Sequence, residues 1–112
     1  MLLLTARRES MQAKVAVIGR LRFPPERVQE VLPHMKAMVE ATRRHDGCIS
    51  YDIAQDLFEP GVIRVSELWP DHASLERHIQ APHVLPWRAA AQACGVIEKS
   101  YTIYDLAAAR EV

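Results

Sequence analysis

The chain has 112 residues, of which 49% are hydrophobic, and its 14 basic and 14 acidic side chains cancel at neutral pH. This length suits one globular domain with a single core. The balanced charge provides no basic surface for nucleic acid or for an anionic membrane, so neither partner is expected. The apolar run Met1 to Leu4 is far shorter than a secretory segment or the ~20 residues of a membrane span, which predicts a cytoplasmic protein.

Residues 1–11 precede the patterned part of the chain and are interpreted as a flexible extension. One domain is expected over residues 12–108, followed by a short tail over residues 109–112. The sequence contains neither internal repeats nor a glycine-rich phosphate loop, and this excludes the common flavin and nicotinamide sites.

The domain opens with apolar residues at every second position from Val15 to Phe23, which predicts a strand with one buried face. Pro24 and Pro25 end this strand and begin a helix, in which apolar residues recur at helical spacing. Pro33 lies inside the helical pattern and lacks a backbone donor, so we expect either a kink or a helix start delayed to that point.

Two more strands are expected over about 48–56 and 62–69, joined by the turn Glu59-Pro60-Gly61. Placing Tyr51 opposite Val65 also places Asp52 opposite Arg64, a favourable charge pair, so this register is preferred. One face then carries Ile49, Tyr51, Ile53, Ile63, Val65, Glu67 and Trp69. Glu67 is the anomaly of this apolar face, because a buried carboxylate is costly unless it is paired or becomes protonated.

The remaining chain predicts two short helices and a last strand. Asp71 is the expected N-cap of the first helix, and Pro82 is expected as the first residue of the second. Gly95 is a typical helix stop. The resulting order is strand, helix, strand, strand, two helices, strand, so the fold class is α+β with an antiparallel four-stranded sheet covered by helices on one face.

Several motifs of this chain resemble the antibiotic biosynthesis monooxygenase (ABM) family. The family pattern Glu-x-Trp, Leu-x-x-His and Pro-His is matched by Glu67 and Trp69, Leu75 and His78, and Pro82 and His83. Upstream, Gly47-Cys48-Ile49-Ser50-Tyr51 is similar to the family's Gly-Cys-x-x-Tyr. The resemblance implies a ferredoxin-like βαββαβ sandwich that forms a dimeric α+β barrel.

A homodimer is also expected from the pattern of the other sheet face, which would carry Ile18, Leu68 and Ala54. A sheet covered by helices on one side commonly buries its other side by pairing with a second copy. The two sheets would then lie face to face.

Glu67 and His78 are the candidate catalytic residues. At ~3.4 Å per strand residue, Glu67 lies roughly 7 Å from the end of its strand, and at ~1.5 Å per helix residue, His78 lies roughly 9 Å along the helix that follows. The two side chains are therefore expected at similar depth in the sandwich. The two would form a general-base pair, in which Glu67 assists the imidazole. A purely structural histidine at this position is about equally compatible with the pattern.

The candidate substrate-binding residues are aromatic or ionisable side chains of the same region: Tyr51, Trp69, His83 and Trp87. Core packing is the alternative role for both tryptophans, and a position at the domain edge is the alternative for His83. Gly19 is expected to leave space in the pocket for a planar ligand. The spacing of His78 and His83 does not match a metal-binding motif, and no metal is expected.

The resemblance implies a monooxygenase that needs no cofactor and that acts on a small quinol or polyphenol-like aromatic together with dioxygen. Two alternatives are an isomerase of a small hydroxy-ketone and a non-catalytic module that binds a small ligand. Haem degradation is disfavoured, because Gly19 and Arg88 stand where haem-degrading relatives have an asparagine and a haem-ligating histidine.

Overall fold

The computed structural model describes residues 10–112, so the prediction for the extension over residues 1–11 falls almost entirely outside the described part. The elements follow the predicted βαββαβ order, with the fifth position filled by two helices. They are β1 (Val15–Arg22), the 3-10 turn η1 (Pro25–Arg27), α2 (Val28–His45), β2 (Ser50–Gln55), β3 (Val62–Trp69), α3 (His72–Ile79), α4 (Val84–Ala93) and β4 (Glu98–Asp105).

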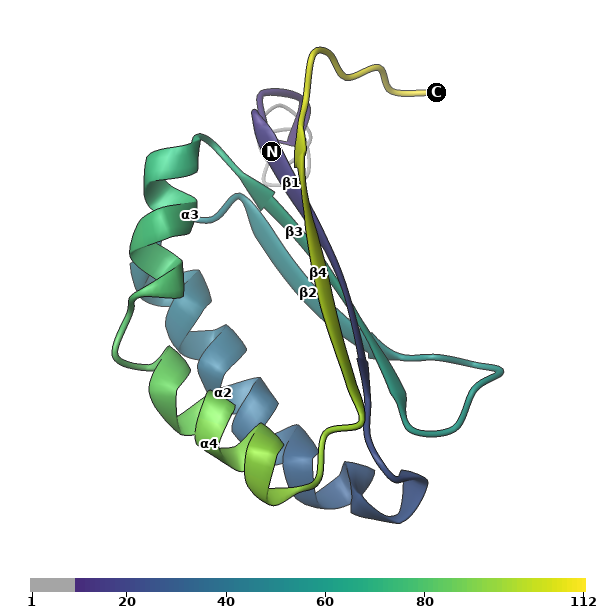
Figure 1. Ribbon diagram of the computed structural model, residues 1–112. Helices are drawn as coiled ribbons and strands as arrows, with labels where there is room; N and C mark the ends of the chain where they lie inside the picture. The colour runs from purple at the N-terminus through teal and green to yellow at the C-terminus, as the bar shows by residue number, and fades with distance from the viewer. Residues whose placement is uncertain (1–9) are drawn as a thin grey trace.

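The four strands form one antiparallel sheet in the order β2-β3-β1-β4. Helices α2, α3 and α4 all lie on one side of the sheet, and the opposite side carries no helix of the described chain (Figure 1). The alternating pattern of β1 explains this layering, because Val15, Val17 and Leu21 are buried while Ile18 on the other face is 50% exposed. The predicted ferredoxin-like fold is therefore confirmed.

The predicted register of the β2-β3 hairpin is wrong by two residues. Tyr51 lies opposite Glu67, and Ile53 lies opposite Val65. The charge pair that favoured the other register does not form, because Asp52 contacts Arg43 of α2 at 3.2 Å and Arg64 contacts Asp56 at 3.1 Å. A shift of two residues preserves which side chains share a face, so Glu67 still lies on the buried side.

Helix α2 begins at Val28 and runs through Pro33, so the expected delay of the helix start is wrong. Pro33 is exposed on the side of the helix away from the core. The buried stripe of α2 includes Val31, Met35 and Val39, which are the positions expected from the helical spacing. Burial of this stripe against the sheet offsets the backbone hydrogen bond that proline cannot donate.

The two short helices are placed by their end residues. The Asp71 carboxylate accepts a hydrogen bond from the backbone N–H of Ser74 at 2.8 Å, which confirms the predicted N-cap of α3. Helix α4 begins at Val84, two residues later than expected from Pro82. Gly95 follows α4 with a φ of 75°, the left-handed conformation that allows the chain to leave the helix.

Within residues 10–112, no helix is both long and apolar enough to cross a membrane.

Candidate active site

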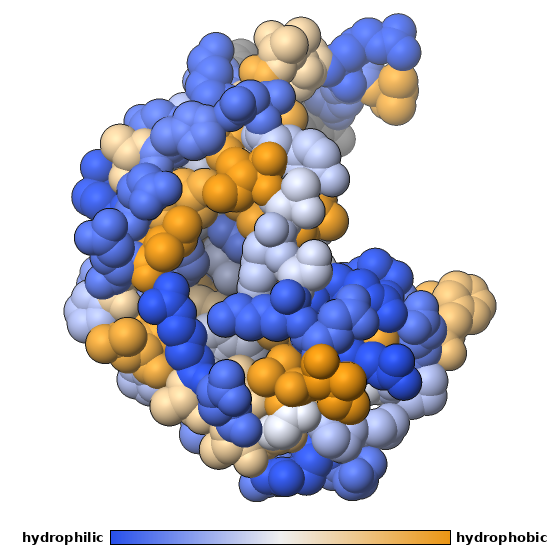
Figure 2. Space-filling model, viewed as in Figure 1, coloured by the Kyte–Doolittle hydropathy of each residue, from blue (hydrophilic) through white to orange (hydrophobic). Residues whose placement is uncertain are grey.

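A cavity of about 220 Å³ lies between the sheet and helices α3 and α4. Its opening is visible as a hollow between the helical layer and the sheet (Figure 2). The volume falls below the ~300–1,000 Å³ typical of sites for drug-sized ligands, so the cavity suits a small ligand. Its polar lining comes from Tyr51, Glu67, His78, Arg88, Lys99 and Tyr101, and apolar side chains supply the rest.

Glu67 is a buried carboxylate at the floor of this cavity, with only 3% of its surface exposed. Oε1 of Glu67 accepts a hydrogen bond from the indole Nε1 of Trp69 at 2.8 Å, and the carboxylate also accepts one from the Tyr51 hydroxyl. Loss of hydration outweighs these two donors and raises the Glu67 pKa to about 7. The carboxylate therefore exchanges a proton near neutral pH, as a general acid or base requires.

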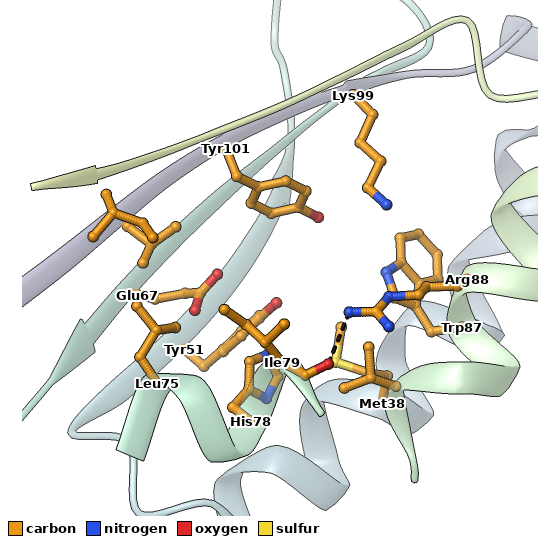
Figure 3. Close-up of a pocket in the computed structure, with 13 residues that line it drawn as sticks. Met38, Tyr51, Glu67, Leu75, His78, Ile79, Trp87, Arg88, Lys99 and Tyr101 are labelled. Carbon is orange, nitrogen blue, oxygen red and sulfur yellow. Dashed lines mark hydrogen bonds between the residues drawn. The ribbon is translucent and has the colours of Figure 1, made fainter. Parts of the chain in front are cut away.

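Two tyrosines face the cavity near Glu67 (Figure 3). Burial, followed by the neighbouring Glu67 charge, raises the pKa of Tyr51 well above its ordinary value, and the same two causes raise that of Tyr101. Both phenols consequently stay protonated at neutral pH and act as hydrogen-bond donors.

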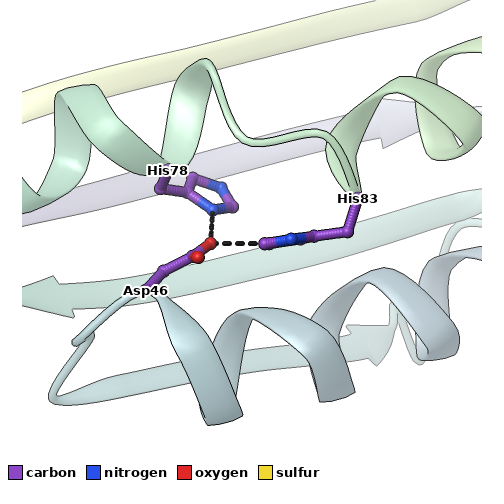
Figure 4. A group of neighbouring side chains, drawn as sticks. All are labelled: Asp46, His78 and His83. Atoms are coloured by element: carbon purple, nitrogen blue, oxygen red, sulfur yellow. Dashed lines mark hydrogen bonds and ion pairs between the residues drawn. The ribbon is translucent and has the colours of Figure 1, made fainter.

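His78 projects from α3 into the cavity beside Tyr51, with ring centroids 5.6 Å apart. Its Nδ1 lies 2.8 Å from Oδ2 of Asp46, the residue that follows α2 (Figure 4). An ionised carboxylate can only accept a hydrogen bond, so Nδ1 carries the proton and Nε2 is left as a proton acceptor. Burial lowers the pKa of His78, although the Asp46 carboxylate acts in the opposite direction. The lowered pKa keeps the imidazole neutral.

The same oxygen of Asp46 also contacts Nε2 of His83 at 2.7 Å (Figure 4). One carboxylate therefore joins three segments: the end of α2, the end of α3 and the residue before α4. The side chains of Asp46 and His78 are each only 8% exposed, so both hydrogen bonds lie in a partly desolvated environment that strengthens them.

Asp46, His78 and His83 also form a group of described residues that could hold a metal ion. Their ligand atoms lie within 4.8 Å of one another. Two imidazoles and one carboxylate are a donor set that suits zinc or a similar divalent transition metal. The sequence prediction considered the two histidines without Asp46, because that residue lies 32 positions before His78.

Of the six residues predicted for the site, the cavity is lined by His78, Glu67, Tyr51 and Trp87. Trp69 is fully buried behind Glu67, where it donates to the carboxylate. His83 is not among the residues that line the cavity, and it contacts Asp46 instead (Figure 4). Glu67 and His78, which were expected to act as a pair, have separate hydrogen-bond partners: Glu67 pairs with Trp69 and Tyr51, and His78 pairs with Asp46.

The expectation that Gly19 leaves space for a planar ligand is wrong. Gly19 lies opposite Tyr101 in the sheet, and a Cβ added to it would lie 2.7 Å from the Tyr101 ring. The phenol ring thus occupies the space above the glycine. Tyr101 was missed in the sequence because β4 carries no motif, although a glycine within a strand often marks a close approach by a neighbouring group.

Comparison with known proteins identifies the family of this chain. The sequence model of the family described as antibiotic biosynthesis monooxygenase matches residues 14–90. The protein Rv0793 of Mycobacterium tuberculosis, named as a putative monooxygenase, is 33% identical over 79 residues, which cover 70% of this chain and 77% of that protein. An uncharacterised Synechocystis protein is 29% identical over 62% of this chain. The matched region spans about half, 47%, of that relative.

Among solved structures, one described as a putative antibiotic biosynthesis monooxygenase from Deinococcus radiodurans superposes with a TM-score of 0.82 and 26% sequence identity. The match covers 88% of this chain and 97% of that one. The chain therefore belongs to the antibiotic biosynthesis monooxygenase family. Membership establishes the fold and the class of domain, whereas the chemistry depends on the residues that line the cavity.

Proposed function

We propose that this protein is a cofactor-independent monooxygenase that acts on a small dihydroxyaromatic compound such as a quinol. The observation that carries the proposal is the cavity in which a neutral histidine oriented by Asp46 lies near a buried carboxylate with a pKa of about 7. Both groups accept protons near neutral pH, and both are shielded from bulk water.

The first step is removal of a phenolic proton by Nε2 of His78. Asp46 holds the opposite ring nitrogen, which fixes the tautomer and stabilises the imidazolium that forms. Tyr101 offers a hydroxyl donor toward the substrate oxygens, while the Tyr51 hydroxyl donates to Glu67 and Trp87 supplies an aromatic wall. A bound phenolate in this partly apolar cavity is electron-rich and poorly hydrated.

The phenolate then reacts with dioxygen, which forms a carbon–oxygen bond and yields a hydroperoxide after protonation. Loss of water from that hydroperoxide leaves a new carbonyl on the ring. One oxygen atom enters the product and the other leaves as water, so the quinol itself supplies all four electrons that reduce dioxygen. The protein contributes proton transfer, orientation and exclusion of water, and no external reductant is consumed.

The test is oxygen uptake by the purified protein with a panel of hydroquinones and naphthohydroquinones, corrected for oxidation without protein. Labelled dioxygen should place one heavy oxygen atom in the product and one in water. Turnover without oxygen uptake would instead identify an isomerase. Saturable binding of these compounds with neither reaction would identify a non-catalytic binding module.

The assembly proposed with this activity is a homodimer paired through the uncovered sheet face. Ile18 and Tyr104, which lie on that face, are 50% and 48% exposed in the single chain. The tip of the β2-β3 hairpin adds Leu57 and Phe58, which are 92% and 89% exposed. Apolar side chains exposed to this degree on one side are characteristic of an interface.

A further inference from the structure

The cavity holds two cationic side chains at the end opposite to its proton-transfer groups. Arg88 projects from α4 and Lys99 from β4, and both point toward the same part of the cavity beside Trp87 (Figure 3). Glu67 and His78 lie at the other end (Figure 3). The cavity is therefore polarised along its length, with proton acceptors at one end and fixed positive charge at the other.

Lys99 reaches the cavity from the inward face of β4. Side chains of β4 alternate between the two sheet faces, and Lys99 shares the inward face with Tyr101 and Ile103. Its neighbour Glu98 points to the opposite face, where it pairs with Arg20 at 2.9 Å. Lys99 is nevertheless exposed to solvent, as Arg88 is, so both side chains can keep their hydration while their charged ends border the cavity.

Arg88 is held in place by one of its donors. Nη2 donates to the backbone carbonyl of Ile79 at 2.8 Å, which anchors the guanidinium across the end of α3. Within residues 10–112 the guanidinium makes no other hydrogen bond, so four of its five N–H groups remain for other partners. Its charge also reaches the cavity interior, since it opposes the rise in the Tyr101 pKa that burial and Glu67 cause.

Neither cation has an acidic partner in the described part of the chain. Among residues 10–112, no carboxylate oxygen lies within 4.0 Å of the charged nitrogens of Arg88 or Lys99, whereas Arg20, Arg27, Arg43 and Arg64 each have such a partner. The cavity's own carboxylate, Glu67, has a pKa of about 7 and is half protonated at neutral pH. The cavity thus carries net positive charge before a ligand enters.

We propose that the cavity selects hydroxyaromatic carboxylates, with the hydroxyl directed to His78 and Glu67 and the carboxylate placed between Arg88 and Lys99. One guanidinium and one ammonium match a carboxylate, because a guanidinium binds both of its oxygens and the ammonium adds a point charge. This inference rests on the proposed assignment of the cavity as the substrate site, and it adds the charge of the substrate to that assignment.

The test uses two fluorescent ligands that share one ring system and do not turn over as quinols. In 6-hydroxy-2-naphthoate the hydroxyl and the carboxylate lie at opposite ends of the naphthalene, and 2-naphthol lacks the carboxylate. Dissociation constants are measured at pH 7.5 by fluorescence titration of the full chain. The carboxylate should bind about tenfold more tightly, as expected for one charge-assisted contact, and the difference should shrink with added salt.

Lys99→Met keeps the apolar stem of the side chain and removes its charge. This variant should lose most of the preference for the carboxylate while binding 2-naphthol as the wild type does. Lys99→Glu should reverse the preference. Lys36→Met is the matched control, because Lys36 lies on the exposed surface of α2 outside the cavity and has only a 4.0 Å contact with Glu40.

Equal affinity of the wild-type protein for the two ligands would overturn the inference and leave the cavity as a ligand site. A carboxylate preference that survives both Lys99→Met and Arg88→Met would also overturn it, because the anion would then bind elsewhere. Failure of both ligands to bind would remove the inference together with the assignment of the cavity. Because binding is measured without turnover, a lack of oxygenase activity would count against the proposed reaction alone.

Discussion

The carboxylate of Asp46 lies 2.8 Å from Nδ1 of His78 and thereby determines which nitrogen of that imidazole faces the cavity as a proton acceptor. The contact joins the C-terminal end of α2 to the last turn of α3. In the sequence the two residues are separated by 32 positions and by the whole β2-β3 hairpin. The arrangement resembles the orientation of catalytic histidines by a buried carboxylate in other enzymes.

Replacing His78 by alanine should reduce turnover of the best quinol by ~10²- to 10⁴-fold, the usual cost of losing a general base. The matched variant is His72→Ala, because His72 lies at the exposed start of α3 and its only polar side-chain partner within residues 10–112 is the exposed Asp105. That variant should retain nearly full activity. Equal activity of the two folded variants would show that His78 is a packing residue.

Asp46→Asn tests the positioning role separately. Asparagine keeps the size of the side chain but loses the charge that raises the His78 pKa, so the pKa of this imidazole should fall further. The turnover rate constant kcat for the quinol should fall by roughly 10- to 100-fold, the typical cost of losing a residue that orients a functional histidine. A purely structural role would change stability without moving the pH–rate profile, which is therefore the deciding measurement.

Glu67→Gln should make stability less dependent on pH. The Glu67 pKa is about 7 in the folded protein against 4.5 for the free side chain, so the folded state binds more protons between these values. The stability of the wild type should fall as pH rises from about 4.5 to 7, by on the order of 3 kcal/mol from this group. Urea unfolding at several pH values should show that the free energy of unfolding of the Gln variant increases relative to that of the wild type as pH approaches neutrality. A constant difference between the two proteins would contradict the raised pKa.

Added zinc should inhibit turnover, and a chelator should restore it. Asp46, His78 and His83 present three ligand atoms within 4.8 Å, and a bound ion would occupy the nitrogen and oxygen that position the general base. Inhibition should weaken at lower pH as protons compete for the imidazoles. Loss of activity on chelation of the protein as purified would show the opposite, that the reaction depends on a metal.

Ile18→Arg should disrupt the proposed dimer. Ile18 is 50% exposed on the uncovered sheet face, and an arginine pair across a two-fold axis would place like charges together in an apolar interface. Light scattering at micromolar concentration should show a dimer for the wild type and a monomer for the variant. A wild-type protein that is already monomeric would refute the assembly proposed from this face.

The layers of this protein follow from local patterns in its amino-acid sequence. Alternation in β1 and helical spacing in α2 identified the buried faces, because both patterns follow from local backbone geometry. Glu67 was correctly expected on the buried side despite a register error, since a slip of two residues leaves the alternation intact. The Asp71 cap and the Gly95 helix stop were predictable for the same local reason.

The contacts between site residues depend on how the separate elements pack. The partner of His78 is Asp46 and the partners of Glu67 are Tyr51 and Trp69, and no spacing in the sequence distinguishes these pairs from the expected contact between Glu67 and His78. Lys99 and Tyr101 enter the cavity only because β4 pairs with β1 at the edge of the sheet. Periodicity specifies the face on which a side chain lies, but the depth and angle at which separate elements pack specify its neighbours.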